Sequence, residues 1–313
     1  MKIVLLEDLA VDKHIIDEHA LKLKDMGHEL VTYDKNTDPE VQKERLKDAD
    51  ICILANMPLS EDAIKDNETL KYIDVAFTGV DHIPVKLAKE KGIKISNASG
   101  YATEAVAELC IGFMIDLLRN VKETEEKCRN GGTKAGLVGS LLKGKVVGIV
   151  GAGAIGKKVA EYVKVFGAHP IAYSRSKVTS EYIEEQVSLE ELMQVSDIVT
   201  LHCPLTDETR NLINKDMLSL MKKSAILINT ARGPVVDSNA LSEALNNEDI
   251  KGAALDVFET EPPLDINHPL LHAKNTIVTP HIAFVSKESM EMRVDIVFDN
   301  LYAYLSGEHK NAI

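Results

Sequence analysis

Short apolar runs rich in β-branched residues alternate with amphipathic stretches along this chain of 313 residues. Each apolar run has the length of a strand, and the stretches between them have the residue spacing of helices. This alternation is typical of parallel sheets, because two parallel strands must be joined by a crossover that is usually helical. The sequence therefore predicts an α/β fold built on parallel sheets.

The predicted strands form two series, which indicates two doubly wound domains, as the length also favours. The first series lies at residues 3–6, 30–33, 51–54, 72–76 and 94–96, with helical patterns at 12–26 and 40–47. The second series lies at residues 146–150, 170–173, 198–201, 225–229, 253–256 and 276–279. We expect residues 98–285 to form one domain, inserted into another that is made from residues 1–97 and 286–313.

Three further segments lie outside the strand series. Residues 103–119 have apolar positions every three or four residues, which predicts a long buried helix between the domains. Residues 121–144 mix charges with glycines and have no clear period, so we expect an extended loop or arm. Residues 286–306 have a helical pattern, and this helix is expected to cover the sheet of the first domain.

The charge balance excludes some classes of partner. There are 36 Lys and Arg against 49 Asp and Glu, a net charge of −13, which disfavours general binding to nucleic acids or anionic membranes. An anionic substrate would therefore need a local positive site.

Location and metal binding are also constrained. The first apolar run is too short for a signal peptide, and no run reaches the roughly 18 residues of a membrane span. The four cysteines are widely spaced, so we expect neither a metal site nor disulfides, but a cytoplasmic protein.

A glycine motif follows the first strand of the second series. Gly151, Gly153 and Gly156 form G-x-G-x-x-G between a strand and a predicted helix. In that context the glycines permit a tight turn and close approach to a pyrophosphate, which the helix N-terminus attracts. The motif predicts a dinucleotide site.

The end of the next strand indicates which dinucleotide is bound. NAD sites usually have an acidic residue there, whereas this chain has Ser174, Arg175 and Ser176. A guanidinium between two hydroxyl groups suits a ribose 2′-phosphate, so the loop favours NADP over NAD. In the alternative interpretation, Arg175 stacks on adenine and either cofactor is accepted.

Three later strands end in residues that could carry catalysis. Arg232, a carboxylate at Glu259 or Glu261, and His281 follow successive strands, and carboxyl ends of parallel strands lie at one edge. Reduction of a 2-oxo acid needs a proton donor such as histidine, a carboxylate that stabilises the imidazolium, and an arginine that binds the substrate carboxylate. Spacing alone does not choose between Glu259 and Glu261.

Four segments carry a family resemblance: GAGAIG at 151–156, NTARG at 229–233, DVFETEPP at 256–263 and TPHIA at 279–283. In this order they resemble the D-isomer-specific 2-hydroxyacid dehydrogenases over essentially the whole chain. The resemblance implies a homodimer with a Rossmann-type nucleotide domain inserted into a flavodoxin-like substrate domain. It also implies that Arg232, Glu261 and His281 are catalytic, which leaves Glu259 solvated.

The resemblance implies further site residues. Backbone N–H groups of the loop at Thr78, Gly79 and Val80 would hold the substrate carboxylate together with Arg232 and His281, and residues 97–103 would form an interdomain hinge. Besides the glycines and residues 174–176, the implied cofactor contacts are Thr103, Ala154, Ile155, Cys203, Pro204, Thr209, Thr230, Ala231, Arg232, Asp256, His281 and Ala283.

The substrate is the least constrained part of the prediction. We expect a small 2-oxo acid, with glyoxylate or hydroxypyruvate favoured. Phe284 is a candidate for the pocket wall, and Tyr101 either reaches the substrate or packs in the core. The alternative function is a dinucleotide-sensing binding protein or corepressor on the same fold, which the absence of a basic recruitment tail disfavours.

Overall fold

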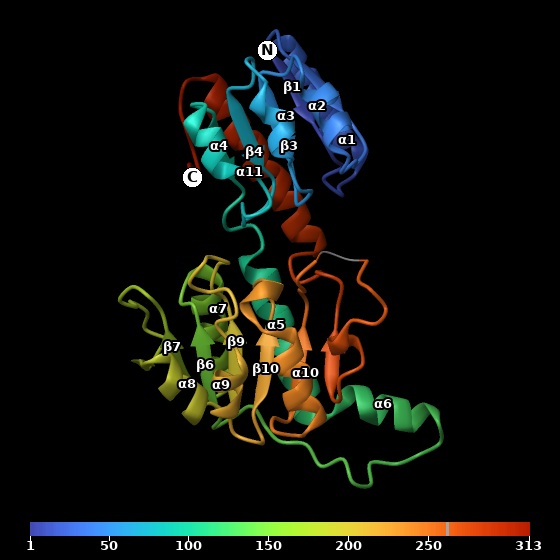
Figure 1. Cartoon of the computed structure of the whole chain (residues 1–313), viewed down its shortest axis with the longest axis vertical. Helices are drawn as coiled ribbons and strands as arrows, with labels where there is room; N and C mark the ends of the chain where they lie inside the picture. Colours follow the sequence, from blue (N-terminus) through green and yellow to red (C-terminus); the bar gives the residue numbers. More distant parts are fainter. Residues whose placement is uncertain (261–262) are drawn as a thin grey trace. The chain divides into compact units, whose positions relative to one another are not determined.

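The chain divides into two compact units (Figure 1). The computed structural model describes residues 1–260 and 263–313. The first unit comprises residues 1–102 and 285–313, and the second comprises residues 103–284. One unit is therefore made from both chain ends, and the other from the middle of the chain.

The observed boundaries between the units, after residues 102 and 284, differ slightly from the predicted boundaries, which follow residues 97 and 285. Residues 98–102 and residue 285 belong to the first unit. The N–H of Ala98 is bonded to the carbonyl oxygens of Val75 at 2.9 Å and Phe77 at 3.0 Å. The backbone thus remains part of the first unit beyond residue 97.

The first unit is built on a parallel sheet. Its strands are β1 (Lys2–Leu5), β2 (Glu29–Thr32), β3 (Ile51–Leu54), β4 (Tyr72–Val75) and β5 (Lys94–Asn97), in the order β2-β1-β3-β4-β5. Its helices are α1 (Lys13–Asp25), α2 (Pro39–Leu46), α3 (Glu61–Lys65), α4 (Val85–Glu90) and α11 (Lys287–Leu305). The strand order is flavodoxin-like, and α11 packs against β4, as predicted for the last helix.

The second unit contains a larger parallel sheet. Its described strands are β6 (Val146–Val150), β7 (His169–Tyr173), β8 (Glu185–Gln186), β9 (Ile198–Leu201), β10 (Ile226–Asn229), β11 (Gly252–Leu255) and β12 (Thr276–Val278). Their order, β12-β11-β10-β9-β6-β7-β8, is the Rossmann order with one added edge strand. The predicted fold class is confirmed.

Helices and short 3-10 turns complete the second unit. They are α5 (Thr103–Arg119), α6 (Val121–Arg129), α7 (Ala154–Val165), α8 (Leu189–Val195), α9 (Lys215–Ser219), η1 (Gly233–Val235), α10 (Ser238–Asn246) and η2 (Pro269–Leu271). Helix α5 has the predicted bounds. It buries Val106, Cys110 and Phe113, and it packs on α7, β10 and β11.

The strand predictions are confirmed to within one residue at each end, but β8 was not predicted. Buried strands of a parallel sheet are recognisable because both of their faces are apolar. Strand β8 has only two residues, Glu185 and Gln186, and both are exposed. It therefore leaves no apolar signal.

The prediction of an extended arm at residues 121–144 was wrong in its first part, where α6 forms. None of the α6 residues is buried, and only Val121 and Cys128 among them are apolar, so the segment lacks the apolar stripe that marks a packed helix. It is instead supported by ion pairs four residues apart, Glu123 with Lys127 at 3.5 Å and Glu125 with Arg129. Asn120, in the left-handed conformation with φ of 53°, separates α6 from α5.

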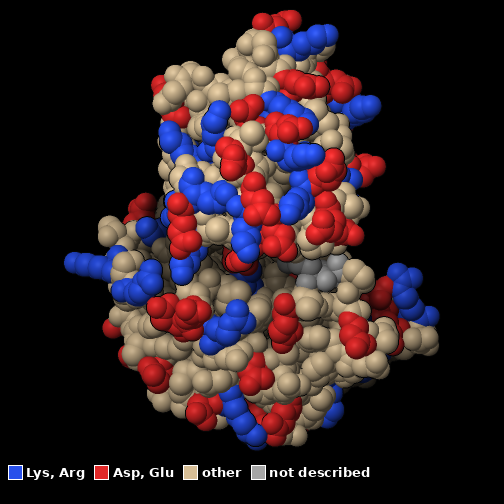
Figure 2. All heavy atoms as spheres, turned by 45° about the horizontal axis from the view of Figure 1, so that its top comes forward, with Lys and Arg blue, Asp and Glu red and all other residues tan. Residues whose placement is uncertain are grey.

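Charged side chains of both signs are interspersed on the face of the molecule that Figure 2 shows. Among the described residues, no helix combines the length and the apolarity that crossing a bilayer requires.

A carboxyl group is buried in the first unit beneath α11. Asp74 in β4 has no exposed surface, and its Oδ1 accepts a hydrogen bond of 3.2 Å from the amide of Asn300. Burial raises the pKa of Asp74 to about 8, because the charged form loses its hydration. The folded protein therefore keeps a proton that the unfolded chain releases at much lower pH.

This proton predicts how stability depends on pH. Where the folded state binds more protons than the unfolded state, stability falls as pH rises, by at most ~1.4 kcal/mol per pH unit for one group. For Asp74 the fall is expected between about pH 4 and pH 8. Asp74→Asn should remove it, so that the variant gains stability relative to the wild type as pH rises.

Thermal unfolding of both proteins across this pH range measures the difference. The exposed Asp17→Asn is the control, and it should follow the wild type. Parallel curves for Asp74→Asn and the wild type would contradict the prediction.

Candidate active site

The glycine turn after β6 is shaped by close backbone contacts. Gly151 has φ of +100°, and a Cβ built on it would lie 2.6 Å from the backbone nitrogen of Cys203. A Cβ on Gly156 would lie 2.2 Å from the carbonyl oxygen of Gly151. Neither position accepts a larger residue without a shift of the backbone.

The space above this turn is open. A Cβ built on Gly153, the N-cap of α7, would have no atom within 4 Å among those described. Ala154 and Ile155 begin α7, so their N–H groups belong to the helix end that attracts anions. Strand β6 lies between β7 and β9, where the strand order reverses and such sheets bind ligands. This arrangement fits a dinucleotide pyrophosphate.

The loop after β7 is held by a residue that sequence reasoning missed. The side-chain amide of Gln186 donates to the carbonyl oxygens of Ser174 at 2.9 Å and Ser176 at 3.0 Å. Its oxygen accepts from the N–H of Val178 at 2.9 Å. One side chain thus fixes the loop that presents Arg175.

A carboxylate also lies near Arg175. The hydroxyl of Thr206 donates to Glu208 at 2.7 Å, and this bond is the main cause that lowers the pKa of Glu208. The positive charge of Arg175 contributes to the same shift. Sequence reasoning searched for an acid only at the end of β7, so it missed Glu208 on another loop.

Other predicted cofactor residues are fixed by polar contacts. The Thr209 hydroxyl donates to the Pro204 carbonyl at 2.6 Å, and Thr230 Oγ1 lies 3.3 Å from the Cys110 thiol. Next to Cys203, His202 Nε2 lies 2.9 Å from the Thr200 hydroxyl. Burial lowers the pKa of His202 to about 3, so its ring is neutral near pH 7.

Arg232 lies in a turn at the end of β10. The buried Asn229 shapes this turn: its Oδ1 accepts from the N–H of Ala231 and its amide donates to the carbonyl of Arg232, both at 3.0 Å. The guanidinium of Arg232 donates to the carbonyl of Ala231 at 2.8 Å. The position of the arginine is therefore set by a local network.

His281 lies in a turn held by Asp256, which has no exposed surface. One Asp256 oxygen accepts from the Thr279 hydroxyl at 2.6 Å and the Ile282 N–H at 2.8 Å, and the other from the Ala283 N–H at 2.8 Å. The N–H of His281 donates to the Asp256 carbonyl at 2.8 Å.

These bonds support an uncommon conformation. His281 has φ of 57°, the left-handed region, which costs energy for a residue with a Cβ. The His281 ring packs edge to face against the Phe284 ring, with 5.2 Å between the ring centroids. Burial raises the pKa of Asp256, although its three donors oppose the shift.

Of the two candidate carboxylates, only Glu259 belongs to the residues that the structure describes. Glu261 lies outside the described residues. Glu259 is described, and its Oε2 lies 3.0 Å from Nε2 of His268. Glu259 is thus exposed but bonded to a neighbour, rather than simply solvated as the family resemblance implies.

The remaining predicted residues lie at separate places. In the first unit, the loop of Thr78, Gly79 and Val80 follows β4, and the Thr78 carbonyl accepts a bond of 2.7 Å from the amide of Asn97. In the second unit, Thr103 is the first residue of α5. Within the described parts of the chain, no group of three or more His, Cys, Asp or Glu residues is arranged to hold a metal ion.

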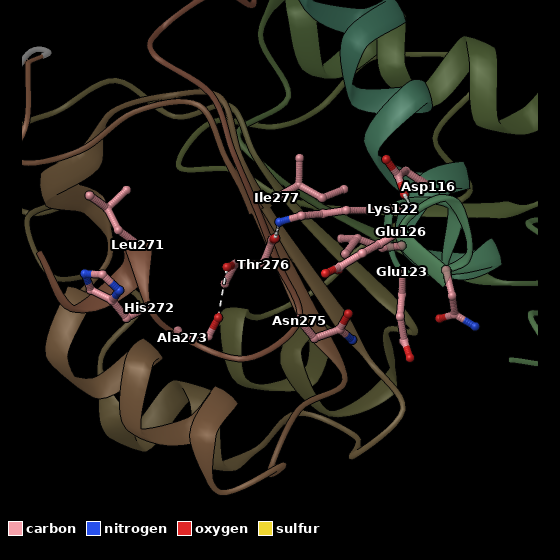
Figure 3. A pocket seen from close by; sticks show the side chains of 12 residues that line it. Asp116, Lys122, Glu123, Glu126, Leu271, His272, Ala273, Asn275, Thr276 and Ile277 are labelled. Carbon is pink, nitrogen blue, oxygen red and sulfur yellow. Dashed lines mark hydrogen bonds between the residues drawn. The ribbon is translucent and has the colours of Figure 1, made fainter. Parts of the chain in front are cut away.

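A hollow of about 350 Å³ in the second unit contains none of the predicted site residues (Figure 3). It lies between α6 and the start of β12, where the Lys122 ammonium donates to the Thr276 carbonyl at 2.8 Å. His281 follows the other end of β12. This hollow is therefore separate from the candidate site.

This chain is similar to a known protein family and to several known proteins. Residues 111–283 match the family profile "D-isomer specific 2-hydroxyacid dehydrogenase, NAD binding domain". A glyoxylate reductase of Aeropyrum pernix is 38% identical over 304 residues, covering 92% of this chain and 90% of the relative. A hydroxypyruvate reductase of Blautia hydrogenotrophica is 32% identical over 324 residues, covering 100% and 99%.

A solved structure is similar over both whole chains. It is an acyclic imino acid reductase in complex with NADPH and D-Arg, with a TM-score of 0.92, 30% identity and 100% coverage of each chain.

The bonds of Asp256 predict the effect of changing it. In Asp256→Asn, either orientation of the new amide places an NH₂ group against an N–H or hydroxyl donor. We expect a loss of roughly 1–3 kcal/mol in the free energy of unfolding, because a buried donor loses its acceptor. Urea unfolding of the whole chain measures it, with the exposed Asp249→Asn as control. Equal stability of Asp256→Asn and the wild type would refute this account of the turn.

Proposed function

Because the chain belongs to the D-isomer-specific 2-hydroxyacid dehydrogenase family, an oxidoreductase family, we propose that it reduces glyoxylate or hydroxypyruvate to the D-2-hydroxy acid with NADPH. The main support is the turn in which Asp256 holds His281, since it presents an imidazole beyond the carboxyl end of β12. The names of the two reductases that resemble this chain support the choice of substrates.

His281 is proposed as the acid and base of the reaction. When bound, the reduced nicotinamide supplies the hydride to the carbonyl carbon of the substrate. The imidazolium of His281 gives its proton to the carbonyl oxygen and becomes neutral, and the reverse reaction returns the proton. Glu261 is proposed to stabilise the imidazolium and orient the ring, on the basis of the family resemblance.

Arg232 and the loop after β4 are proposed to bind the substrate carboxylate. A guanidinium can make two parallel hydrogen bonds to a carboxylate and stabilise charge on the neighbouring oxygen. The local network of Asn229 and Ala231 supports this role, because it limits where the arginine can lie. The backbone N–H groups of residues 78–80 would bind the same carboxylate.

The preference for NADPH is proposed from the loop after β7. Ser174, Arg175 and Ser176 present a cation and two hydroxyl groups, which suit the 2′-phosphate, and Gln186 holds the loop in shape. The similar reductase structure contains NADPH. Glu208 supports the alternative that either cofactor is accepted, because a carboxylate near Arg175 could accept hydrogen bonds from the ribose of NADH.

We also propose that the protein is a homodimer, and that its second copy covers the surface at α6 and the segment after it. Val121, Val138 and Leu141 expose 47%, 93% and 65% of their surface there. The high exposure of these apolar side chains supports a protein interface at this segment.

A substrate panel tests the proposed reaction. The wild type should oxidise NADPH with glyoxylate or hydroxypyruvate, and less efficiently with bulkier 2-oxo acids. His281→Ala should lower kcat by about 10²–10⁴-fold, the usual contribution of a general acid, with little change in NADPH affinity. Absorbance of the reduced nicotinamide gives the rate, and a binding titration gives the affinity.

The same panel distinguishes the alternative function. A protein that binds NADPH tightly but turns over none of these acids would act as a dinucleotide sensor. Full activity of His281→Ala would exclude the role proposed for the imidazole.

The cofactor preference has a separate test. Ser174→Asp should shift the ratio of kcat/KM values toward NADH by at least about tenfold, since the carboxylate repels a 2′-phosphate and accepts from ribose hydroxyls. Steady-state kinetics with both cofactors measure this ratio, and Ser180→Asp on the same loop region is the control. An unchanged ratio in Ser174→Asp would disprove our interpretation of the loop.

A further inference from the structure

The loop proposed to bind the substrate carboxylate is connected to the end of the chain. We propose that Asn97, Asn300 and Asn311 form a positioning network that orients this loop, so that the C-terminal residues control substrate affinity. The inference rests on the proposed function of Thr78, Gly79 and Val80, and it adds residues that do not themselves touch the substrate.

Asn97 makes the contact with the loop. It is the last residue of β5 and is 8% exposed, and its side-chain amide donates to the Thr78 carbonyl at 2.7 Å. Opposite it in β4 is Val75, three residues before the loop. The hydrogen bond therefore joins the end of one strand to the loop that follows its neighbour.

This bond also sets the direction of an N–H group. The peptide between Thr78 and Gly79 is planar, and in the usual trans form its C=O and N–H point in opposite directions. Because the Thr78 oxygen is bonded to Asn97, the Gly79 N–H must point away from Asn97. That N–H is one of the groups proposed to bind the carboxylate, so its orientation affects binding directly.

Asn300 of α11 holds Asn97 from the other side. It is 1% exposed, and its amide donates to the Asn97 carbonyl at 3.0 Å and to the Asp74 carboxyl at 3.2 Å. An amide buried in this way strongly favours one orientation, because any other would leave its N–H groups without acceptors. Asn300 therefore restrains the strand end at Asn97.

Asn311 adds the C-terminal residues to the network. Its amide donates to the Asn300 side-chain oxygen at 2.8 Å, and its carbonyl accepts from the Asn97 N–H at 3.2 Å. Asn311 has φ of 47°, a left-handed conformation that asparagine tolerates better than most residues. The Ser96 hydroxyl donates to the Lys310 carbonyl at 2.6 Å, and the Ile313 N–H donates to the Ile95 carbonyl at 3.0 Å. These two bonds hold residues 310–313 against β5.

The test separates a positioning role from a general effect on folding. Asn97→Asp keeps the shape of the side chain but places a carboxylate oxygen against the Thr78 carbonyl. The Gly79 N–H would then no longer be held in the direction that lets it bond to the substrate carboxylate. We expect the KM for glyoxylate at saturating NADPH to rise by about tenfold, because this hydrogen bond to a charged group is lost. The dissociation constant of NADPH, measured by its fluorescence, should stay within about twofold, because the site that we propose for NADPH belongs to the other unit, residues 103–284.

Asn67→Asp is a matched control. Asn67 belongs to the same unit, is also 8% exposed, and its amide likewise donates to a carbonyl, that of Leu46 at 2.6 Å. Loss of this hydrogen bond in Asn67→Asp should lower the unfolding temperature without raising the KM for glyoxylate. A KM that rises equally in Asn67→Asp and Asn97→Asp would overturn the proposal.

A second variant keeps the test decisive if Asn97→Asp does not fold. Asn311→Ala removes the exposed end of the network and should raise the KM less than Asn97→Asp, again without changing NADPH affinity. If the wild type is active and Asn311→Ala has the same KM as the wild type, the network is refuted but the proposed function is not. A wild type that reduces no 2-oxo acid would refute the proposed function, and this inference with it.

Discussion

Parallel strand pairing is the constraint on which the rest of this structure depends. All hydrogen-bonded strand pairs within the described residues are parallel, so every strand of a sheet ends at the same edge. The segments that follow β6, β10, β11 and β12 therefore meet along one edge, although they are far apart in sequence. Chemistry that needs a dinucleotide, a cation and an imidazole together can be assembled there by changing only the loops.

Buried polar side chains at the strand ends then fix those loops. Asn97, Asn229 and Asp256 each lie at the end of a strand, and each bonds to the backbone of a nearby turn. A buried amide or carboxylate must satisfy its hydrogen bonds, so it allows few loop conformations. The same pattern occurs in both units, which indicates one physical solution to placing loops accurately.

The sequence predicted the features that have a strong local signal. Strands buried on both faces and the apolar period of α5 gave bounds within one residue, and the glycine motif located the turn after β6. Features without a buried apolar face were not predictable: α6 has no buried residue, and Gln186 belongs to a strand of two exposed residues. Asp256 was predicted only as a cofactor contact, because its bonds to residues 279–283 exist only once β11 and β12 are paired.

The charge of the chain raises a different question, namely how a protein with a net charge of −13 could present the positive site that we propose. Arginines alone would be partly neutralised by carboxylates on the same loops. In the second unit, however, Asp256 accepts from three donors of its own turn, Glu208 accepts from Thr206, and Glu259 is bonded to His268. Each of these carboxylates keeps its charge, so its effect on a neighbouring arginine depends on the distance at which these bonds hold it. A binding site for an anion in this acidic chain therefore requires that the acidic side chains be held in place as well as the arginines.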